Sequence, residues 1–400
     1  MSDVLRVEKI TFWEGVAMII GTNIGAGILG VSYAARQAGY MPLLFWLVVV
    51  GVITTVTMLY VAEATLRTRQ HEQLSGLAQR YVGGFGSWLM FASVTVNALG
   101  ALIAYMSGSG DLMHSLFGID KRIGSILFFI PAALILALGL KALGRSEKWI
   151  TSLMVLMLLV LVGATLFFPT TDFRRLLDGS WLYMVPVFNL VVFIYCAQYI
   201  VPEIARGLSH TPKQLPKAIV TGMFCTFALI ALVPLSVISL NGLDNVSQVA
   251  TVNWGNALGS WAFFMANGFA LFAMLTSYWG IGGSFLTNIA DRFSLKVDDN
   301  LKVRSLTVAV VALPPLVLAY SGMVGFVDAL YFAGVFSGVI LSIVPYLIIK
   351  GARGKGNRTP EWTCAPWMTH PAIYTLIFLL YSASAVYAVL AKLDLLPPGW

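Results

Sequence analysis

Long apolar segments recur along almost the whole chain and are separated by short polar connections. A membrane-crossing helix needs roughly 20 mostly apolar residues, and eleven segments meet that length. They lie at 11–39, 42–66, 85–117, 122–140, 147–168, 183–207, 217–240, 260–290, 303–320, 324–349 and 371–393. Because these spans leave no room for a separate soluble domain, the pattern predicts an all-α integral membrane protein with a single transmembrane domain over residues 1–400.

The polar connections between the spans indicate how the chain is oriented. With the N-terminus in the cytoplasm, 19 of the 25 Lys and Arg residues fall on the cytoplasmic side, as the positive-inside rule requires. The net charge of +7 is therefore a topology signal and not the footprint of a nucleic-acid partner. An odd number of spans places the C-terminus outside, so we expect a multi-pass protein of the cytoplasmic (inner) membrane.

Composition supports the membrane interpretation. Hydrophobic residues make up 58% of the chain and charged residues 11%, whereas soluble domains carry about 25% charged residues. The three cysteines are far apart and form no C-x-x-C pair, which argues against a disulfide framework and a zinc site. The N-terminal residues MSDVLRVEKI precede no small-residue cleavage site, so we expect the first span to stay in place as an anchor.

Two connections are more than short loops. Residues 71–86 alternate apolar and polar positions at helical spacing, which predicts a helix along the cytoplasmic membrane surface. Residues 241–260 are too polar to span the bilayer and too numerous for a tight turn. We expect them to form a helical cap on the extracellular side.

The first span contains an unusual sequence at its centre, Gly21-Thr22-Asn23-Ile24-Gly25-Ala26-Gly27. Glycine costs about 1 kcal/mol relative to alanine inside a helix, and unwound backbone is tolerated at membrane depth only where it lines a cavity. The alternative is close helix packing, since Gly21 and Gly25 have the spacing of four that mediates it. The polar Thr22 and Asn23 favour a broken helix.

The sixth span carries a proline after a polar cluster. Pro202 has no N–H to donate and clashes with the backbone one turn earlier, near Gln198. The cluster Tyr195-Cys196-Ala197-Gln198-Tyr199 stands just before it. We predict a second interruption here, and a simple proline kink is the alternative.

The two interrupted spans are the first members of two sets of five, residues 11–168 and 183–350. Sets with an odd number of spans enter the membrane from opposite sides, which predicts a five-plus-five inverted repeat with discontinuous helices one and six. Broken helices in corresponding positions of such repeats mark a transporter's substrate site. Their exposed N-termini attract a carboxylate. The span 371–393 is an additional C-terminal helix outside the repeat.

The first span, with GTNIGAGILGVSYAARQAGY, resembles the first helix of the amino acid/auxin permease group and its bacterial relatives, the aromatic and hydroxy amino acid permeases. This group belongs to the amino acid-polyamine-organocation superfamily. The layout of eleven spans with a late proline in span six is also similar. The resemblance implies the inverted-repeat fold of neurotransmitter sodium symporters and secondary active uptake of an amino acid, driven by a cation gradient.

The resemblance also implies a sodium site. Ala273, Thr276 and Ser277 stand at i, i+3 and i+4, so they share one helical face. Sodium symporters of this fold use one carbonyl and two hydroxyls at that spacing, together with two carbonyls of the first span. By similarity these carbonyls belong to Gly21 and Ile24. In the alternative, the two hydroxyls bond to carbonyls one turn earlier in their own helix.

Proton coupling is the rival to sodium, and it needs a titratable group inside the membrane. The four histidines fall at span ends or in loops, and Glu203 is the carboxylate to test. Asp291, at the end of the eighth span, is expected to pair with Arg6 or Lys9 as a cytoplasmic gate, unless Asp291 is a solvated loop charge.

We expect the substrate to be a neutral, hydrophobic or aromatic amino acid held by backbone and side chains around the two breaks. The predicted substrate-binding residues are Thr22, Asn23, Gly25, Ala26, Gly27, Asn97, Phe193, Tyr195, Cys196, Ala197 and Gln198. Besides the coupling ion and the bilayer, no cofactor or nucleic-acid partner is expected.

Other classes of function fit less well. A channel needs a continuous polar pore lining, and no span repeats polar residues along its length. An enzyme would need a motif such as HExxH or GxSxG, or a carboxylate pair at membrane depth, and the spans contain none. An amino-acid sensor built on the same fold remains an alternative.

Overall fold

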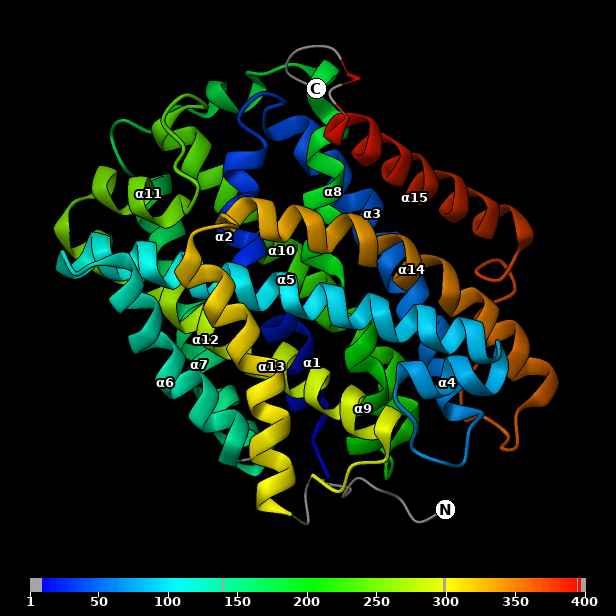
Figure 1. The fold of residues 1–400 in the computed structure, drawn as a ribbon. Coiled ribbons are helices and arrows are strands. Elements are labelled where there is room, and N and C mark those ends of the chain that lie inside the picture. The colour runs from blue at the N-terminus through cyan, green and yellow to red at the C-terminus, as the bar shows by residue number, and fades with distance from the viewer. Residues whose placement is uncertain (1–8, 139, 298–299, 394, 397–400) are drawn as a thin grey trace.

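The computed structural model describes residues 9–138, 140–297, 300–393 and 395–396, and within these residues it is helical, with no strand. Its α-helices are α1 (Phe12–Asn23), α2 (Ala26–Ala34), α3 (Tyr40–Leu66), α4 (Leu74–Tyr81), α5 (Gly84–Phe117), α6 (Lys121–Leu138), α7 (Leu140–Leu166), α8 (Met184–Tyr195), α9 (Val201–Gly207), α10 (Leu215–Asn241), α11 (Ala250–Leu258), α12 (Ser260–Phe293), α13 (Leu301–Ser321), α14 (Phe326–Lys355) and α15 (Pro371–Lys392). The short 3-10 helices are η1 (Phe173–Leu177), η2 (Trp181–Tyr183), η3 (Gln198–Ile200) and η4 (Pro212–Gln214). Figure 1 shows their arrangement.

These helices account for the eleven predicted spans. Among the described residues, nine helical segments are long and apolar enough to cross a membrane, and the bent pair formed by α1 and α2 makes a tenth. The eleventh span is α7, whose described apolar part is Ile150–Leu166. α7 begins at Leu140, seven residues before the predicted start, because a helix can continue beyond the apolar part that a hydropathy pattern detects.

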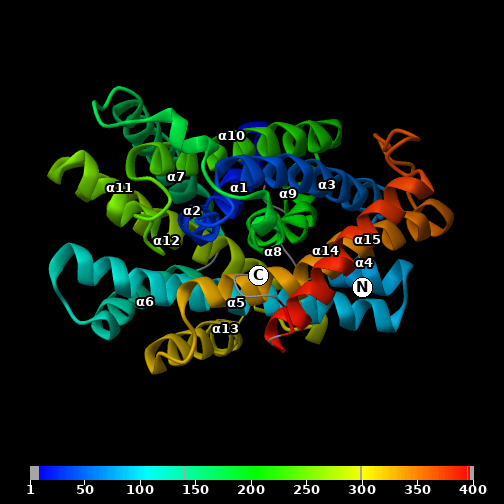
Figure 2. The ribbon, with the colours of Figure 1, turned by 90° about the horizontal axis from the view of Figure 1, so that it is seen from above.

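The broken helices occupy the centre of the bundle. α1 packs against α10 and α12, while α8 packs against α3 and α14. In the apolar 18-residue stretch of the span that contains α8 and α9, 83% of the residues are buried within the protein. In that of α15, on the outer flank against α14, only 22% are buried. The view from above shows α15, α6 and α13 around the outside of the central helices (Figure 2). Large apolar side chains are exposed along these outer helices, as expected of a surface that faces lipid.

Both predicted surface segments contain a helix. α4 lies within residues 71–86 and packs against α5, while α11 lies within residues 241–260 and packs against α12. The two helices lie at opposite ends of the molecule in both views (Figures 1 and 2). Which side of the membrane each of these two helices faces stays a prediction.

The first span is broken where its glycines predicted. α1 ends at Asn23, α2 begins two residues after Ile24, and the two segments differ in direction by 45°. Gly25 has no room for a side chain, since a Cβ there would lie 2.6 Å from both the Ser277 Oγ and the Tyr105 hydroxyl. The glycine therefore serves close approach at the break and not only helix–helix packing.

The sixth span is interrupted as well, without a glycine. α8 ends at Tyr195, Cys196 and Ala197 leave the α-helix, and the chain resumes through η3 into α9. Pro202 lies in the first turn of α9, where its missing N–H has no helical partner to lose. The proline thus begins a new helix instead of kinking a continuous one.

Candidate functional site

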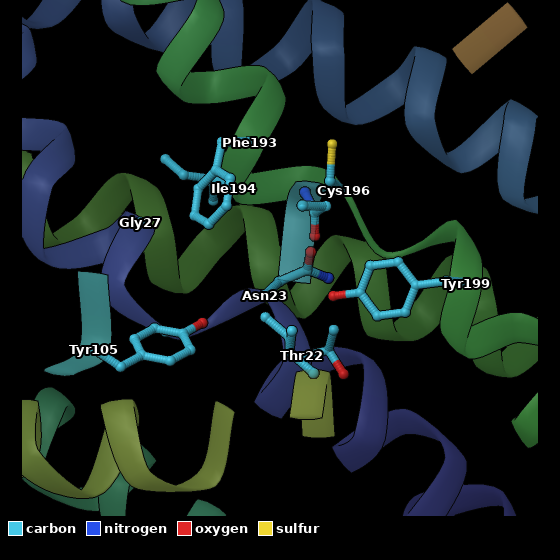
Figure 3. A pocket seen from close by; sticks show the side chains of 11 residues that line it. Thr22, Asn23, Gly27, Tyr105, Phe193, Ile194, Cys196 and Tyr199 are labelled. Carbon is cyan, nitrogen blue, oxygen red and sulfur yellow. The ribbon is translucent and has the colours of Figure 1, made fainter. Parts of the chain in front are cut away.

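A pocket lies between the two breaks (Figure 3). Its walls come from α1, α2, α5, α8, η3 and α12 and from the residues at the breaks. They are Thr22, Asn23, Gly25, Gly27, Asn97, Tyr105, Phe193, Ile194, Cys196, Tyr199 and Ile281. The described lining residues carry no charged side chain, so the pocket offers aromatic surface, neutral polar groups and backbone.

Seven of the predicted substrate-binding residues line this pocket: Thr22, Asn23, Gly25, Gly27, Asn97, Phe193 and Cys196. For Ala26 the structure describes only the backbone, which begins α2. The structure thus brings together residues from three separate parts of the sequence, and the role of each in substrate binding stays a prediction.

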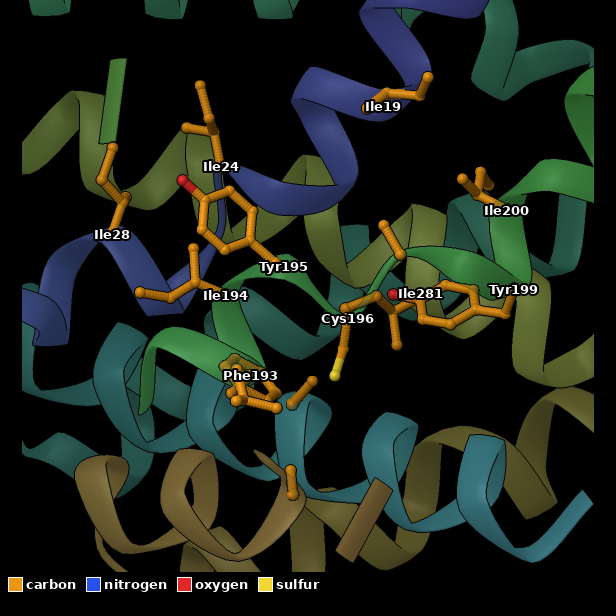
Figure 4. Close-up of a cluster of buried hydrophobic side chains, with 14 of the residues drawn as sticks. Ile19, Ile24, Ile28, Phe193, Ile194, Tyr195, Cys196, Tyr199, Ile200 and Ile281 are labelled. Atoms are coloured by element: carbon orange, nitrogen blue, oxygen red, sulfur yellow. The ribbon is translucent and has the colours of Figure 1, made fainter. Parts of the chain in front are cut away.

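Three other predicted residues lie beside the pocket but outside its wall. The ring of Tyr195 points toward Ile24 (Figure 4). It also lies against Gly51 in α3, where an added Cβ atom would be 3.3 Å from the ring. Gln198 donates its side-chain N–H to the Thr57 Oγ1, also in α3, at 3.1 Å. Ala197 is fully buried, and its N–H donates to the carbonyl of Tyr195 at 2.7 Å.

Four lining residues were absent from the prediction: Tyr105, Ile194, Tyr199 and Ile281. Helical spacing could have found two of them. Tyr105 stands two turns beyond Asn97, and Ile281 stands one turn beyond Ser277, so each lies on the same face as a residue already selected. Tyr199 was visible only as the end of the polar cluster in span six.

The start of α2 has features that favour an anion. The N-cap of this helix is Gly25, which provides no side-chain hydrogen bond to the first N–H groups. Such N–H groups and the positive end of the helix dipole favour a carboxylate. Gly25 and Gly27 both line the pocket, so a carboxylate there meets backbone rather than side chains.

Asn23 leaves one acceptor unused beside the same pocket. Its side-chain N–H donates to the Ile19 carbonyl at 2.9 Å, whereas its Oδ1 is buried and has no hydrogen-bond partner within the described part of the chain. An unsatisfied buried polar group costs about 1–3 kcal/mol. A ligand that donates a hydrogen bond, such as an ammonium group, would remove that cost.

Five oxygen atoms predicted as sodium ligands lie in one buried neighbourhood. The Ser277 hydroxyl donates to the Gly21 carbonyl at 2.8 Å and to the Ile24 carbonyl at 3.3 Å, which links α12 to the break in span one. The Thr276 hydroxyl donates to the carbonyl of Ala273 at 3.2 Å. It also donates to the carbonyl of Phe272 at 3.0 Å. Both bonds of Thr276 run to the preceding turn of α12, as the back-bonding alternative predicted for this residue.

The chemistry of this oxygen set suits a monovalent cation. The five groups are carbonyls and hydroxyls without charge, and the side chains of Thr276 and Ser277 are each 1% exposed. Unwound backbone in transporters coordinates such ions in this way. Among the described residues no group of three or more His, Cys, Asp or Glu could hold a metal ion.

The predicted cytoplasmic gate falls partly outside the described residues, because Arg6 is not among them. Asp291 lies near the end of α12 and accepts a hydrogen bond from the backbone N–H of Gln73, the N-cap residue of α4. A Cβ on Gly76 would lie 3.2 Å from its Oδ2. Asp291 therefore faces the surface helix, and its pairing with Arg6 stays a prediction.

Glu203, the carboxylate to test for proton coupling, has partners on both oxygens. Its Oε1 accepts from the Gln73 side chain at 2.6 Å and from the Thr287 hydroxyl at 3.4 Å. Its Oε2 pairs with Arg206, and both side chains are about 90% buried. This carboxylate lies in α9, which begins after the break in span six.

The fold and the pocket define a membrane transporter with a central site between two broken helices. The structure of MhsT in complex with L-phenylalanine has a TM-score of 0.69 at 16% identity and covers 95% of this chain and 100% of that one. That likeness confirms the predicted fold class, an inverted repeat. A model of the tryptophan/tyrosine permease family matches residues 8–387. The chain belongs to this family, as the resemblance in span one predicted.

Curated relatives are similar over most of the chain. The tryptophan-specific transport protein of Shigella flexneri is 24% identical and covers 96% of each chain. Tyrosine-specific transport system 1 of Haemophilus influenzae is 23% identical, over 84% of this chain and 87% of that protein. Glutamine transporter 2 of Aliivibrio fischeri is 21% identical, over 85% and 89%. The chain is therefore a multi-pass amino-acid transporter and not an enzyme.

Proposed function

We propose that the protein is a sodium-coupled secondary active importer of neutral, hydrophobic or aromatic amino acids. It lies in the inner membrane, with its N-terminus in the cytoplasm and its C-terminus outside. The Ser277 hydroxyl carries the proposal, since it bridges the carbonyls of Gly21 and Ile24 beside the pocket.

The pocket supports an aromatic or hydrophobic substrate. Tyr105, Phe193 and Tyr199 provide ring surface, and Ile194 and Ile281 provide apolar surface. Rings pack well against other rings in edge or offset arrangements. The relatives named for tryptophan and tyrosine and the phenylalanine complex of MhsT point to the same substrate class.

Two helix ends can hold the amino-acid backbone. The substrate carboxylate binds at the N-terminus of α2, where the N-cap Gly25 leaves N–H groups uncapped. The ammonium group donates to the unused Oδ1 of Asn23 and lies near the C-terminal end of α8, where the helix dipole is negative. The negative carboxylate thus meets the positive end of one helix dipole, and the positive ammonium group meets a neutral acceptor near the negative end of another.

Sodium supplies the link between the ion gradient and this site. A cation at Gly21, Ile24, Ala273, Thr276 and Ser277 would hold α12 against the break that also forms the substrate wall. The hydrogens of the Thr276 and Ser277 hydroxyls would turn away from the carbonyl oxygens, so that all five oxygens could coordinate the sodium ion. Because both ligands order the same break, each should raise the affinity of the other by an equal factor.

Proton coupling through Glu203 is the competing proposal, supported by the burial of its side chain. A proton on Glu203 would weaken its pairing with Arg206 and change its hydrogen bonds with Gln73 and Thr287. Gln73 is the N-cap residue of α4 and Thr287 lies in α12, so that change would alter how α9 is held against both. Glu203→Gln mimics the protonated state and distinguishes the two proposals.

The decisive experiment measures tryptophan and phenylalanine binding to purified protein at zero and saturating sodium and at two pH values. We expect sodium to raise affinity and pH to have little effect. The double change Thr276→Ala and Ser277→Ala removes two of five ligands at roughly 1.5–3 kcal/mol each, or two or more decades in sodium affinity. A wild type indifferent to sodium but sensitive to pH, with Glu203→Gln insensitive to pH, would overturn sodium coupling.

A further inference from the structure

One wall of the pocket carries a polar group that the amino-acid backbone does not need. Asn97 in α5 lines the pocket and is 2% exposed. Its Nδ2 donates to the Ser337 hydroxyl in α14 at 3.0 Å. Its Oδ1 takes part in no hydrogen bond among the described residues. A buried amide at an apolar wall is costly unless its oxygen also finds a donor.

The neighbours of Asn97 determine which way its amide points. Ser337 donates its one hydroxyl hydrogen to the Ala333 carbonyl, so toward Asn97 it can only accept. Ser93 in turn donates to the Ser337 carbonyl at 3.2 Å, which joins α5 and α14 at this point. Nδ2 of Asn97 must therefore face Ser337, and Oδ1 is left as an acceptor on the pocket side.

The position of Asn97 suits the far end of a substrate side chain. Tyr105 lies on the same face of α5 as Asn97, eight residues later, which is about 12 Å along a helix. The Tyr105 hydroxyl adjoins Gly25, where the carboxylate binds in the proposed function. Gly25 and Asn97 both line the pocket, so a substrate whose carboxylate binds at Gly25 has its side chain in the same pocket as Asn97.

We propose that Oδ1 of Asn97 accepts a hydrogen bond from an N–H or O–H group on a large aromatic substrate side chain, and that Ser337 positions the amide for this role. The inference rests on the proposed amino-acid site and adds its selectivity. An indole or a phenol would donate to this oxygen, whereas a purely apolar ring leaves it without a donor. A site built around a hydrogen bond rejects analogues that lack the donor.

The test compares tryptophan with 3-benzothienylalanine, in which sulfur replaces the indole N–H at nearly constant shape. Dissociation constants are measured by calorimetry on the purified full-length protein in sodium chloride. We expect the wild type to prefer tryptophan by at least about tenfold, the factor that one buried hydrogen bond provides. Asn97→Leu should reduce the preference to less than threefold, and Ser337→Ala should reduce it partially because the amide can then rotate.

Ser109→Ala is the matched control, since Ser109 is a buried hydroxyl of the same helix that bonds within it to Met106. It should keep the tryptophan preference. Equal affinity for the two ligands in the wild type would overturn the inference and leave amino-acid transport intact. Binding of neither ligand, with binding of another amino acid, would also overturn it. Failure of the wild type to bind any amino acid would instead count against the proposed function.

Discussion

The two broken spans differ in how the chain leaves the helix and in what the break contacts. In span one the chain turns at Ile24 and Gly25, and α12 approaches so closely that its Ser277 hydroxyl bonds the exposed carbonyls. In span six Cys196 and Ala197 leave the helix without a glycine, and Gln198 bonds α3. The inverted repeat is therefore unequal at its centre: span one exposes backbone as well as side chains, while span six has no glycine through which its backbone could approach as closely.

This inequality has a physical cause. Backbone can approach a ligand or another helix only where no Cβ intervenes, and a Cβ on Gly25 would collide with two neighbours. Span six has no such position, so its contribution to the pocket comes from Phe193, Cys196 and Tyr199. We infer that the ion and the carboxylate depend on span one, and that side-chain selectivity depends on span six and α5.

Labelling of single cysteines tests the orientation on which the comparison depends. Asn245 precedes α11 and Gly354 lies at the end of α14, and both are exposed. A cysteine at 245 should react fully with a membrane-impermeant reagent in intact cells, whereas one at 354 should react only after permeabilisation. The opposite pattern would reverse the topology, and with it the side from which each broken span enters the membrane.

Gly25→Leu should abolish amino-acid binding, a loss of at least about a hundredfold in affinity. The added side chain would occupy the space beside Ser277 and Tyr105. Thermal-shift titration with tryptophan provides the measurement. Gly163→Leu in α7 is the matched control, since a Cβ there meets nothing within 4 Å. Retained binding in the Gly25 variant would show that span one does not carry the carboxylate site.

Gln198→Leu should have the smallest effect. It removes one hydrogen bond to Thr57 but also removes a buried Oε1 that has no partner among the described residues. These opposite contributions should leave the free energy of unfolding within about 1 kcal/mol of the wild type. The tryptophan dissociation constant should change by less than threefold. A tenfold change would show that span six acts on the substrate through its outer face as well.

Hydropathy and glycine placement determined much of this molecule from the sequence alone. Apolar runs of bilayer length have one stable solution, the helix, because lipid cannot satisfy backbone polar groups. The break in span one was equally readable, since Gly21, Gly25 and Gly27 with Thr22 and Asn23 are costly inside a helix at that depth. The shared face of Ala273, Thr276 and Ser277 followed from helical spacing.

Only the tertiary structure decided which residues meet in the pocket. Helical spacing maps sequence onto direction as long as the helix continues, and at residues 196–197 it does not. Cys196 and Tyr199 therefore face the pocket while Tyr195 and Gln198 turn toward α3, a division that the sequence of this polar cluster does not contain. The packing of α5 and α12 then added Tyr105 and Ile281, because contacts between distant helices depend on the relative placement of whole helices, which local spacing does not define.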